Sequence, residues 1–206
     1  MSPGATMERV YLDLKARILG GAYPPGTRLD AGQLARTLAA SATPVRDALY
    51  RLSGERIIES WHQEGFRQPQ LTEADIHALY SWTGALLSLA LKGRAPPSGL
   101  TGPIEIETGA DYPDSLDRLF RVIAASCQNG ELRLALINAI ERSAIMRKVE
   151  ARIDEAAHAM LAAMIDDYRF GRWSALRSKI TRFHRRRSRQ AGRVAAEIKR
   201  RAEPLR

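Results

Sequence analysis

The sequence has little of what enzymes with covalent or metal chemistry use. Its 206 residues include one cysteine, Cys127, and four histidines, so no internal disulfide can form and a Cys/His metal cluster has few ligands to draw on. No glycine-rich phosphate loop or nucleophile elbow occurs, and the carboxylate pair Asp166-Asp167 would leave a helix on two different sides. No run approaches the roughly 18 apolar residues of a membrane span, and the first residues lack an apolar signal core. These absences predict a cytoplasmic protein that is not an enzyme, needs no cofactor and does not associate with a membrane.

Positive charge is in excess, but it is unevenly distributed. The formal net charge is +9. Residues 1–72 carry 9 Lys/Arg and 7 Asp/Glu, residues 73–168 carry 9 and 14, and residues 169–206 carry 14 and 2. A positive excess favours a nucleic-acid partner. The basic run at 184–189 has three interpretations that stay open: contact with DNA, pairing with the acidic middle segment, or a solvated helix face.

Residues 41–52 are predicted to form a helix with one buried and one exposed face. Ser41 can cap its first turn, and Pro44 lies where the first turn has no N–H to lose. The apolar positions recur at i, i+3, i+4 and i+7, which are Val45, Ala48, Leu49 and Leu52. The positions off that face are Thr43, Arg46, Asp47 and Tyr50. A helix placed end-on in a major groove uses its N-terminus for phosphates and its first exposed side chains for base edges.

The neighbouring segments complete a winged helix-turn-helix. Residues 30–40 are predicted to form a short helix, and its short link to the next helix is typical of a helix-turn-helix. Extended runs at 57–61 and 66–69 on either side of Gly65 predict a β-hairpin, the wing. The remaining elements predicted for this region are a leading helix at 7–19 and a short strand at 27–29.

Residues 7–72 resemble the DNA-binding domain of GntR-type bacterial transcription regulators. The matching features occur in order, namely Ile18–Gly21, Tyr23–Leu29, Leu34-Ala35, Ser41–Leu52 and Gly65-Phe66. Ala42 departs from the family, which has Arg there, and Arg56 departs from the family's Gly. The resemblance implies contacts with a double-stranded DNA operator, and the predicted contact residues are Arg28, Ser41, Thr43, Arg46, Arg51, His62, Gly65 and Arg67. For Arg51 and His62, a solvated position is the open alternative.

Residues 73–206 are predicted to form an antiparallel bundle of α-helices. Thr72 can cap the first helix, whose first turn carries Glu73 and Asp75 at the positive end of the helix dipole. A Gly/Pro-rich stretch at 92–113 excludes a helix through its centre, although residues 104–107 alternate as a short extended piece would. Apolar periodicity places the helices at about 72–91, 114–128, 131–146, 151–168 and 172–201.

This second region resembles the FCD-type effector domain of FadR/VanR-like GntR regulators. The resemblance rests on Asp117, Phe120 and Asn129. In that family a His follows the Phe, and with the Asp and two later histidines it binds a metal that holds the carboxylate of a small organic acid. Here Arg121 takes the place of that His, and a guanidinium stays charged and cannot join a metal shell.

We therefore expect no metal and an effector site made of Asp117, Arg121, His158 and His184. In this site Arg121 grips a small anionic metabolite bidentately. An ion pair between Arg121 and Asp117, one helical turn apart, is the equal alternative. The family has a further helix where this chain has 93–113, so a reduced, open or unused pocket is also expected.

The sequence thus predicts a mainly α fold with an N-terminal winged helix-turn-helix, 1–72, and a C-terminal helical bundle, 73–206. The predicted function is that of a metabolite-responsive, DNA-binding transcription regulator. A homodimer is expected because one winged helix reads only a few base pairs. Two other functions stay open: an all-α sensor or dimerisation protein with DNA binding weakened by Ala42, and a metal-dependent bundle enzyme.

Overall fold

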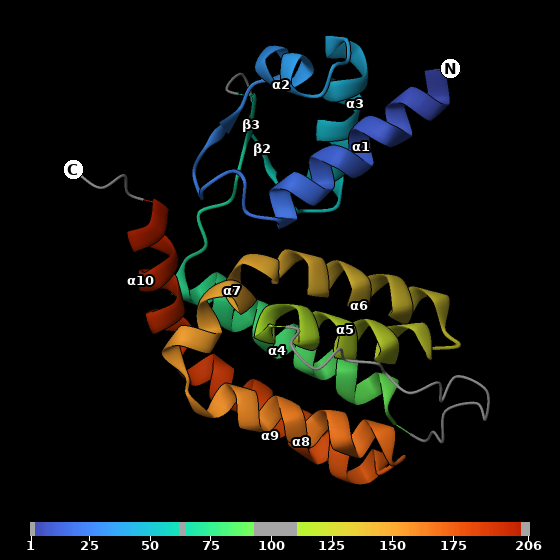
Figure 1. Cartoon of the computed structure of the whole chain (residues 1–206), viewed down its shortest axis with the longest axis vertical. Helices are drawn as coiled ribbons and strands as arrows, with labels where there is room; N and C mark the ends of the chain where they lie inside the picture. Colours follow the sequence, from blue (N-terminus) through green and yellow to red (C-terminus); the bar gives the residue numbers. More distant parts are fainter. Residues whose placement is uncertain (1–2, 62–64, 93–110, 203–206) are drawn as a thin grey trace. The chain divides into compact units, whose positions relative to one another are not determined.

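The structure is a computed structural model that describes residues 3–61, 65–92 and 111–202 (Figure 1). It divides into two compact units. The first unit comprises Met1–Leu71 with Ile198–Arg206, and the second unit comprises Thr72–Glu197. A small antiparallel sheet follows the N-terminal helices, and the rest of the described chain is helical. The predicted fold class is therefore confirmed.

In the first unit, three helices enclose one apolar core. They are α1 (Pro3–Leu19), α2 (Ala31–Thr37) and α3 (Ala42–Gly54). The start of α2 is fixed by Asp30, whose carboxylate accepts a hydrogen bond of 2.8 Å from the backbone N–H of Gln33. The core side chains of these helices are less than one-tenth exposed and include Val10, Leu14, Leu34, Leu38, Leu49 and Leu52. Burial of this apolar face supplies most of the drive to fold so small a domain.

The wing is a three-stranded antiparallel sheet in the order β1-β3-β2. Its strands are β1 (Arg28–Leu29), β2 (Glu59–Trp61) and β3 (Gly65–Arg67). The first wing strand is shorter than predicted. Ile57 and Ile58, which the sequence placed in that strand, instead belong to the core, where they are 5% and 2% exposed. Residues 62–64, at the wing tip, lie outside the described residues.

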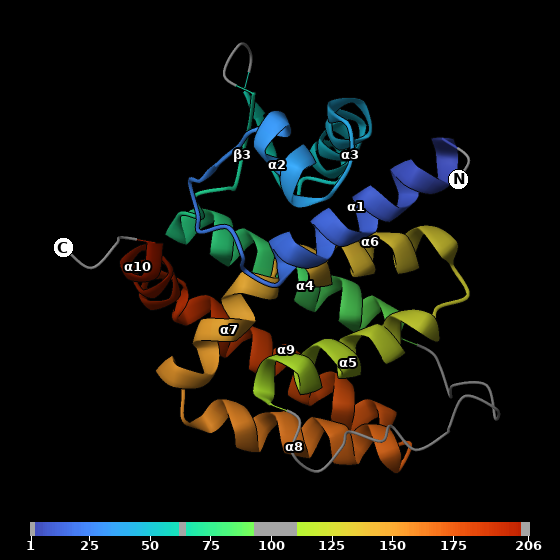
Figure 2. The same cartoon turned by 45° about the horizontal axis from the view of Figure 1, so that its top comes forward.

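In the second unit, a helical bundle is built around α4 and α9 (Figures 1 and 2). Its helices are α4 (Glu73–Ala90), α5 (Tyr112–Ala125), α6 (Gly130–Arg142), α7 (Ala144–Ile153), α8 (Ala156–Arg169) and α9 (Trp173–Arg189), and α10 (Ala191–Ala202) begins in this unit. Helices α4 and α9 approach closely at Gly84. A Cβ atom there would lie 2.9 Å from the Cβ of His184, so only glycine allows this approach.

Side-chain caps fix the starts of the first three helices of the bundle. Thr72 and Asp75 form a capping box at α4, and the side chains of Asp111 and Asn129 cap α5 and α6. The helix predicted at 131–146 ends at Ser143 because the hydroxyl of Ser143 donates to the carbonyl groups of Ala139 and Ile140, both at 2.9 Å. The long helix predicted to end near 201 is interrupted at Gln190, and nothing in the sequence there explains the break.

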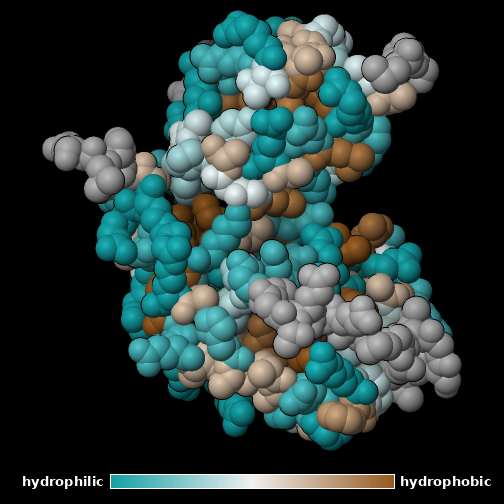
Figure 3. All heavy atoms as spheres, viewed as in Figure 1, coloured by the Kyte–Doolittle hydropathy of each residue, from teal (hydrophilic) through white to brown (hydrophobic). Residues whose placement is uncertain are grey.

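The surface shown in Figure 3 is largely hydrophilic with scattered apolar residues. On α4, Tyr80, Thr83 and Gly84 face inward, whereas Trp82 and Leu89 are 50% and 55% exposed. None of the described helices is both long enough and apolar enough to cross a membrane. The predicted extended piece at 104–107 lies outside the described residues.

Candidate nucleic-acid interface

Helix α3 has the two faces that its sequence predicts. The four apolar residues Val45, Ala48, Leu49 and Leu52 are all 0% exposed, which confirms the predicted inner face. The other face consists of exposed residues at i, i+3, i+4 and i+7, namely Thr43, Arg46, Asp47 and Tyr50. The ring of Tyr50 is 64% exposed and still meets the ring of Phe66 edge-on, with centroids 5.0 Å apart. The helix therefore presents a hydroxyl, a guanidinium, a carboxylate and a phenol along one stripe.

The N-terminus of α3 is less completely capped than predicted. Ser41 has the extended conformation of an N-cap residue, but its side chain accepts no hydrogen bond from the described helix. The physical reason is Pro44. An N-cap side chain bonds the N–H of the second or third helical residue, and the third residue here is a proline without an N–H. The prediction that Ser41 caps this helix was therefore wrong, and its exposed hydroxyl stands beside a helix end that favours anions.

Two residues beside the helix-turn-helix have a left-handed backbone that normally favours glycine. Ala39, between α2 and α3, has φ 46°, and Arg56, just after α3, has φ 58°. The backbone N–H of Arg56 donates to the carbonyl of Ser53 at 2.9 Å, which closes the end of α3. A side chain in this conformation costs about 1–2 kcal/mol. The position where the sequence departs from the family glycine is therefore a strained one.

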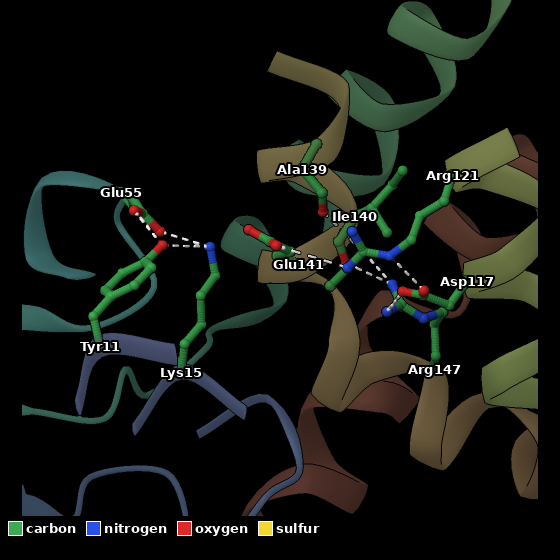
Figure 4. A network of polar contacts seen from close by, with 10 residues as sticks. Tyr11, Lys15, Glu55, Asp117, Arg121, Ala139, Ile140, Glu141 and Arg147 are labelled. Atoms are coloured by element: carbon green, nitrogen blue, oxygen red, sulfur yellow. Dashed lines mark hydrogen bonds and ion pairs between the residues drawn. The ribbon is translucent and has the colours of Figure 1, made fainter. Parts of the chain in front are cut away.

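Arg51 interacts with residues of its own domain. Its guanidinium lies 2.8 Å from the carboxylate of Glu8 and 3.5 Å above the ring of Tyr11. Tyr11 and Lys15 donate to Glu55 at 2.7 and 2.9 Å (Figure 4). Burial opposes ionisation of Glu55, but the hydrogen bonds from Lys15 and Tyr11 prevail and lower the pKa of its carboxyl. The network fastens α3 to α1, and a phosphate contact from Arg51 would have to replace its pair with Glu8.

The wing gathers the two predicted strand arginines. Arg67, in the central strand, is opposite Arg28 on one side and Glu59 on the other. The Arg67 guanidinium lies 5.4 Å from the ring centroid of Trp61, whose indole N–H donates to Glu59 at 3.2 Å. Trp61 is 50% exposed, and the sequence did not predict an aromatic side chain on this surface. Gly65 has φ 85°, so the turn into β3 needs glycine.

His62 lies outside the described residues. Its proposed contact with DNA therefore stays a prediction. The arginines and helix end described above are groups that DNA-binding proteins use for phosphates, and the exposed first turns of α3 are where such proteins read bases.

Comparison with known proteins shows what this domain is similar to. Residues 6–67 match the family model of the bacterial regulatory proteins of the gntR family. The HTH-type transcriptional regulator YdhC of Bacillus subtilis (strain 168) is 30% identical over 82 residues, which cover 40% of this chain and 37% of YdhC. An HTH-type transcriptional regulator of Agrobacterium vitis, from the TAR-I ttuE-ttuC' intergenic region, is 26% identical over 119 residues, or 58% of this chain and 68% of that protein.

Solved structures share the fold over nearly the whole chain. A GntR transcriptional regulator from Rhodococcus sp. RHA1 has a TM-score of 0.69 at 18% identity and covers 91% of this chain and 97% of its own. E. coli McbR/YncC has a TM-score of 0.64 at 18% identity, and the match covers 96% of this chain and 99% of that protein. The fold of this chain, including its helical C-terminal region, is therefore shared with these solved structures.

The residues predicted to bind an effector fall into separate places in the second unit. Asp117 accepts hydrogen bonds of 2.6 Å from both Arg121 and Arg147, and Arg121 lies 3.7 Å from Glu141 (Figure 4). His158 lies against Tyr112, with ring centroids 5.2 Å apart. Among the described residues, neither His158 nor His184 forms a hydrogen bond or ion pair with Asp117 or Arg121, and no three His, Cys, Asp or Glu residues could hold a metal ion.

His184 is part of the core. Its side chain is fully buried and stacks on Phe120, with ring centroids 5.6 Å apart. Burial, reinforced by the charge of Arg187, lowers the pKa of His184 well below its usual value. A neutral imidazole in this position supports packing between α4 and α9. The Asp117–Arg121 ion pair, predicted as the alternative to an effector grip, is present.

A buried polar cluster in the second unit was not predicted. Glu150 accepts hydrogen bonds from Tyr80 at 2.6 Å, Tyr112 at 3.1 Å and Arg187 at 2.6 Å. Burial opposes the charge of Arg187, but Glu150 and the two tyrosines raise the pKa of its guanidinium. The only available signal was the acidic middle segment, which made intramolecular pairing one interpretation of the basic run.

Proposed function

We propose that the full chain is a sequence-specific, DNA-binding transcription regulator that reads an operator with α3 and the wing. The exposed stripe on α3 supports this proposal most directly, because it presents polar side chains from a helix whose opposite face is entirely buried. Arg46 is the residue assigned to a base edge. Thr43 and Ser41 are assigned to phosphates near the helix N-terminus.

The wing supplies further phosphate contacts in this proposal. Arg28 and Arg67 are neighbours in the sheet and place two positive charges on one side of it. Gly65 permits the turn, and His62 contributes from the wing tip. Arg51 positions α3, because its pair with Glu8 joins that helix to α1.

Binding to the protein's own upstream region tests this function. In a competition assay at one fixed salt concentration, the full chain should prefer a duplex from that region over a random-sequence duplex of equal length. Specific sites are typically bound about 10³- to 10⁷-fold more tightly than non-specific DNA. Equal affinity for the two duplexes would contradict a regulator that reads its own operator.

We also propose that the protein is a homodimer joined through the second unit. Trp82 and Leu89 support this, because they lie seven residues apart on α4, hence on one face, and are half-exposed apolar side chains. Replacing both with serine should shift sedimentation toward the monomer. The matched control replaces Leu134 and Phe170, which are 62% and 70% exposed. A shift toward the monomer seen only with the control pair would show that the dimer interface contains Leu134 and Phe170 and not this face of α4.

The second unit is proposed to respond to a small anionic metabolite, as FCD-type domains do, without a metal or other cofactor. Arg121 lines an open hollow of about 530 Å³ beside Asp117, large enough for a small organic acid. Its guanidinium is 40% exposed and already pairs with Asp117, so an anion would compete with that carboxylate. A screen of small carboxylates for a change in thermal stability tests this, with Arg121→Gln as the variant that should lose the response.

A further inference from the structure

The basic run near the C-terminus contains arginines that pair with carboxylates and arginines that do not. Arg186 lies 2.6 Å from Asp154, and Arg187 lies 2.6 Å from Glu150. These two arginines account for the intramolecular pairing that the acidic middle segment made plausible. The other arginines here, Arg182, Arg185 and Arg189, have no such partner in the described chain.

Arg182, Arg185 and Arg189 form what we call the α9 ridge. All three are exposed, and their spacing of three and four residues places them on one face of the helix over about 10 Å. Helix α9 itself has no acidic residue. Within the described chain, no carboxylate pairs with any of the three. The ridge therefore carries three uncompensated positive charges in a line.

A hollow of about 380 Å³ lies beside the ridge, between α4 and α9. Its polar lining consists of His77, Ser81, Ser88, Thr181, Arg185 and Ser188. The ring of His184 also lines it, buried against Phe120. Hydroxyls and an arginine are groups that bind phosphate oxygens.

We propose that the α9 ridge and the hollow beside it bind the phosphate backbone of duplex DNA, as a second contact outside the winged helix. Three features favour this partner. The cations are all arginines, whose planar guanidinium matches phosphate geometry. Phosphates on one strand advance about 3.4 Å each along the axis, so the ridge spans about three of them. The neighbouring hydroxyls can donate to the same backbone, whereas an apolar partner would leave them unsatisfied.

The proposal goes beyond operator recognition by α3, and its test uses DNA without an operator. The full chain is titrated against a random-sequence duplex at several salt concentrations between about 50 and 200 mM. One variant carries Arg182→Gln, Arg185→Gln and Arg189→Gln. The control carries Arg133→Gln, Arg152→Gln and Arg169→Gln, three exposed arginines on other helices with the same total charge change. Each phosphate contact contributes about 0.9 to the slope of log affinity against log salt.

The magnitude of that slope should fall by about 2–3 in the ridge variant and by much less in the control. A triple Arg-to-Lys ridge variant should keep most of the slope, because lysine still carries the charge. Equal slopes for the ridge and control variants would overturn the proposal, as would a native protein that does not bind the random duplex. A ridge variant that changes sedimentation but not the slope would assign the surface to self-association instead.

The outcome is distinguishable from failure of the proposed function. Loss of operator preference on changing Arg46 concerns α3 alone, while the slope on random DNA concerns the ridge. Circular dichroism of each variant checks that the helices are retained, as expected for exposed positions.

Discussion

The two units of this protein place arginine differently, because among the described residues only the second unit buries any. In the first unit, Arg28 and Arg46 are exposed. In the second unit, Arg147 and Arg187 are 4% and 5% exposed and form ion pairs with Asp117 and Glu150. The difference teaches that a local excess of basic residues does not identify a nucleic-acid surface. An arginine is available to bind DNA only if no carboxylate from another helix pairs with its guanidinium.

The largest effect is expected from removing Glu150, the buried partner of Arg187. Glu150→Ala should lower the free energy of unfolding by about 3–5 kcal/mol, because Arg187 would be left charged, buried and unpaired. Denaturant unfolding followed by circular dichroism measures this. Asp13→Ala, which breaks the exposed pair with Arg17, is the control and should change stability little. Similar losses in the two variants would show that the buried pair has no special weight.

The pH dependence of stability tests the buried core of the second unit. The folded pKa of His184 lies well below its usual value, so in moderately acidic solution the unfolded chain binds a proton that the folded chain does not. The contribution of His184 to the free energy of unfolding is therefore complete above about pH 6.5. Below that pH it falls by about 1.4 kcal/mol per pH unit, until the folded pKa is reached.

His184→Gln removes this titration and leaves every carboxylate in place. The difference in stability between the native protein and the variant should therefore change with pH between about 6.5 and 5. Two parallel curves in that range would contradict a neutral, buried His184.

The smallest expected effect concerns backbone strain in the first unit. Arg56→Gly should raise the free energy of unfolding by about 0.5–1 kcal/mol, because glycine adopts the left-handed conformation without steric cost. Arg36→Gly, in the last turn of α2, is the matched control and should lower it. Thermal unfolding of the two variants measures both. Destabilisation by both changes would mean that Arg56 compensates for its strain through contacts of its own.

Local periodicity was sufficient to predict the two faces of α3. They follow from a spacing of three and four residues, and burial follows that spacing because the helix packs on one core. Apolar character alone does not predict burial on α4, where Trp82 and Leu89 are half-exposed because the bundle leaves part of that helix uncovered.

The polar core of the second unit could not be predicted in this way. Glu150 lies 70 residues from Tyr80 and 37 from Arg187, and no local pattern joins such partners. Two short-range details were also missed, although the sequence contained them. Pro44 removes the N–H that Ser41 would cap, and Arg56 occupies a position that needs a positive φ.

The central claim is that the exposed face of α3 reads DNA, and Arg46→Ala tests it most directly. The measurement is the affinity of the full chain for a duplex from its own upstream region, at a single salt concentration, compared with Arg17→Ala as a control of equal charge. Arg46→Ala should weaken specific binding by about 1–3 kcal/mol, and Arg17→Ala should leave it nearly unchanged. Equal affinities for the native protein and both variants would contradict the assignment of α3 as the reading helix.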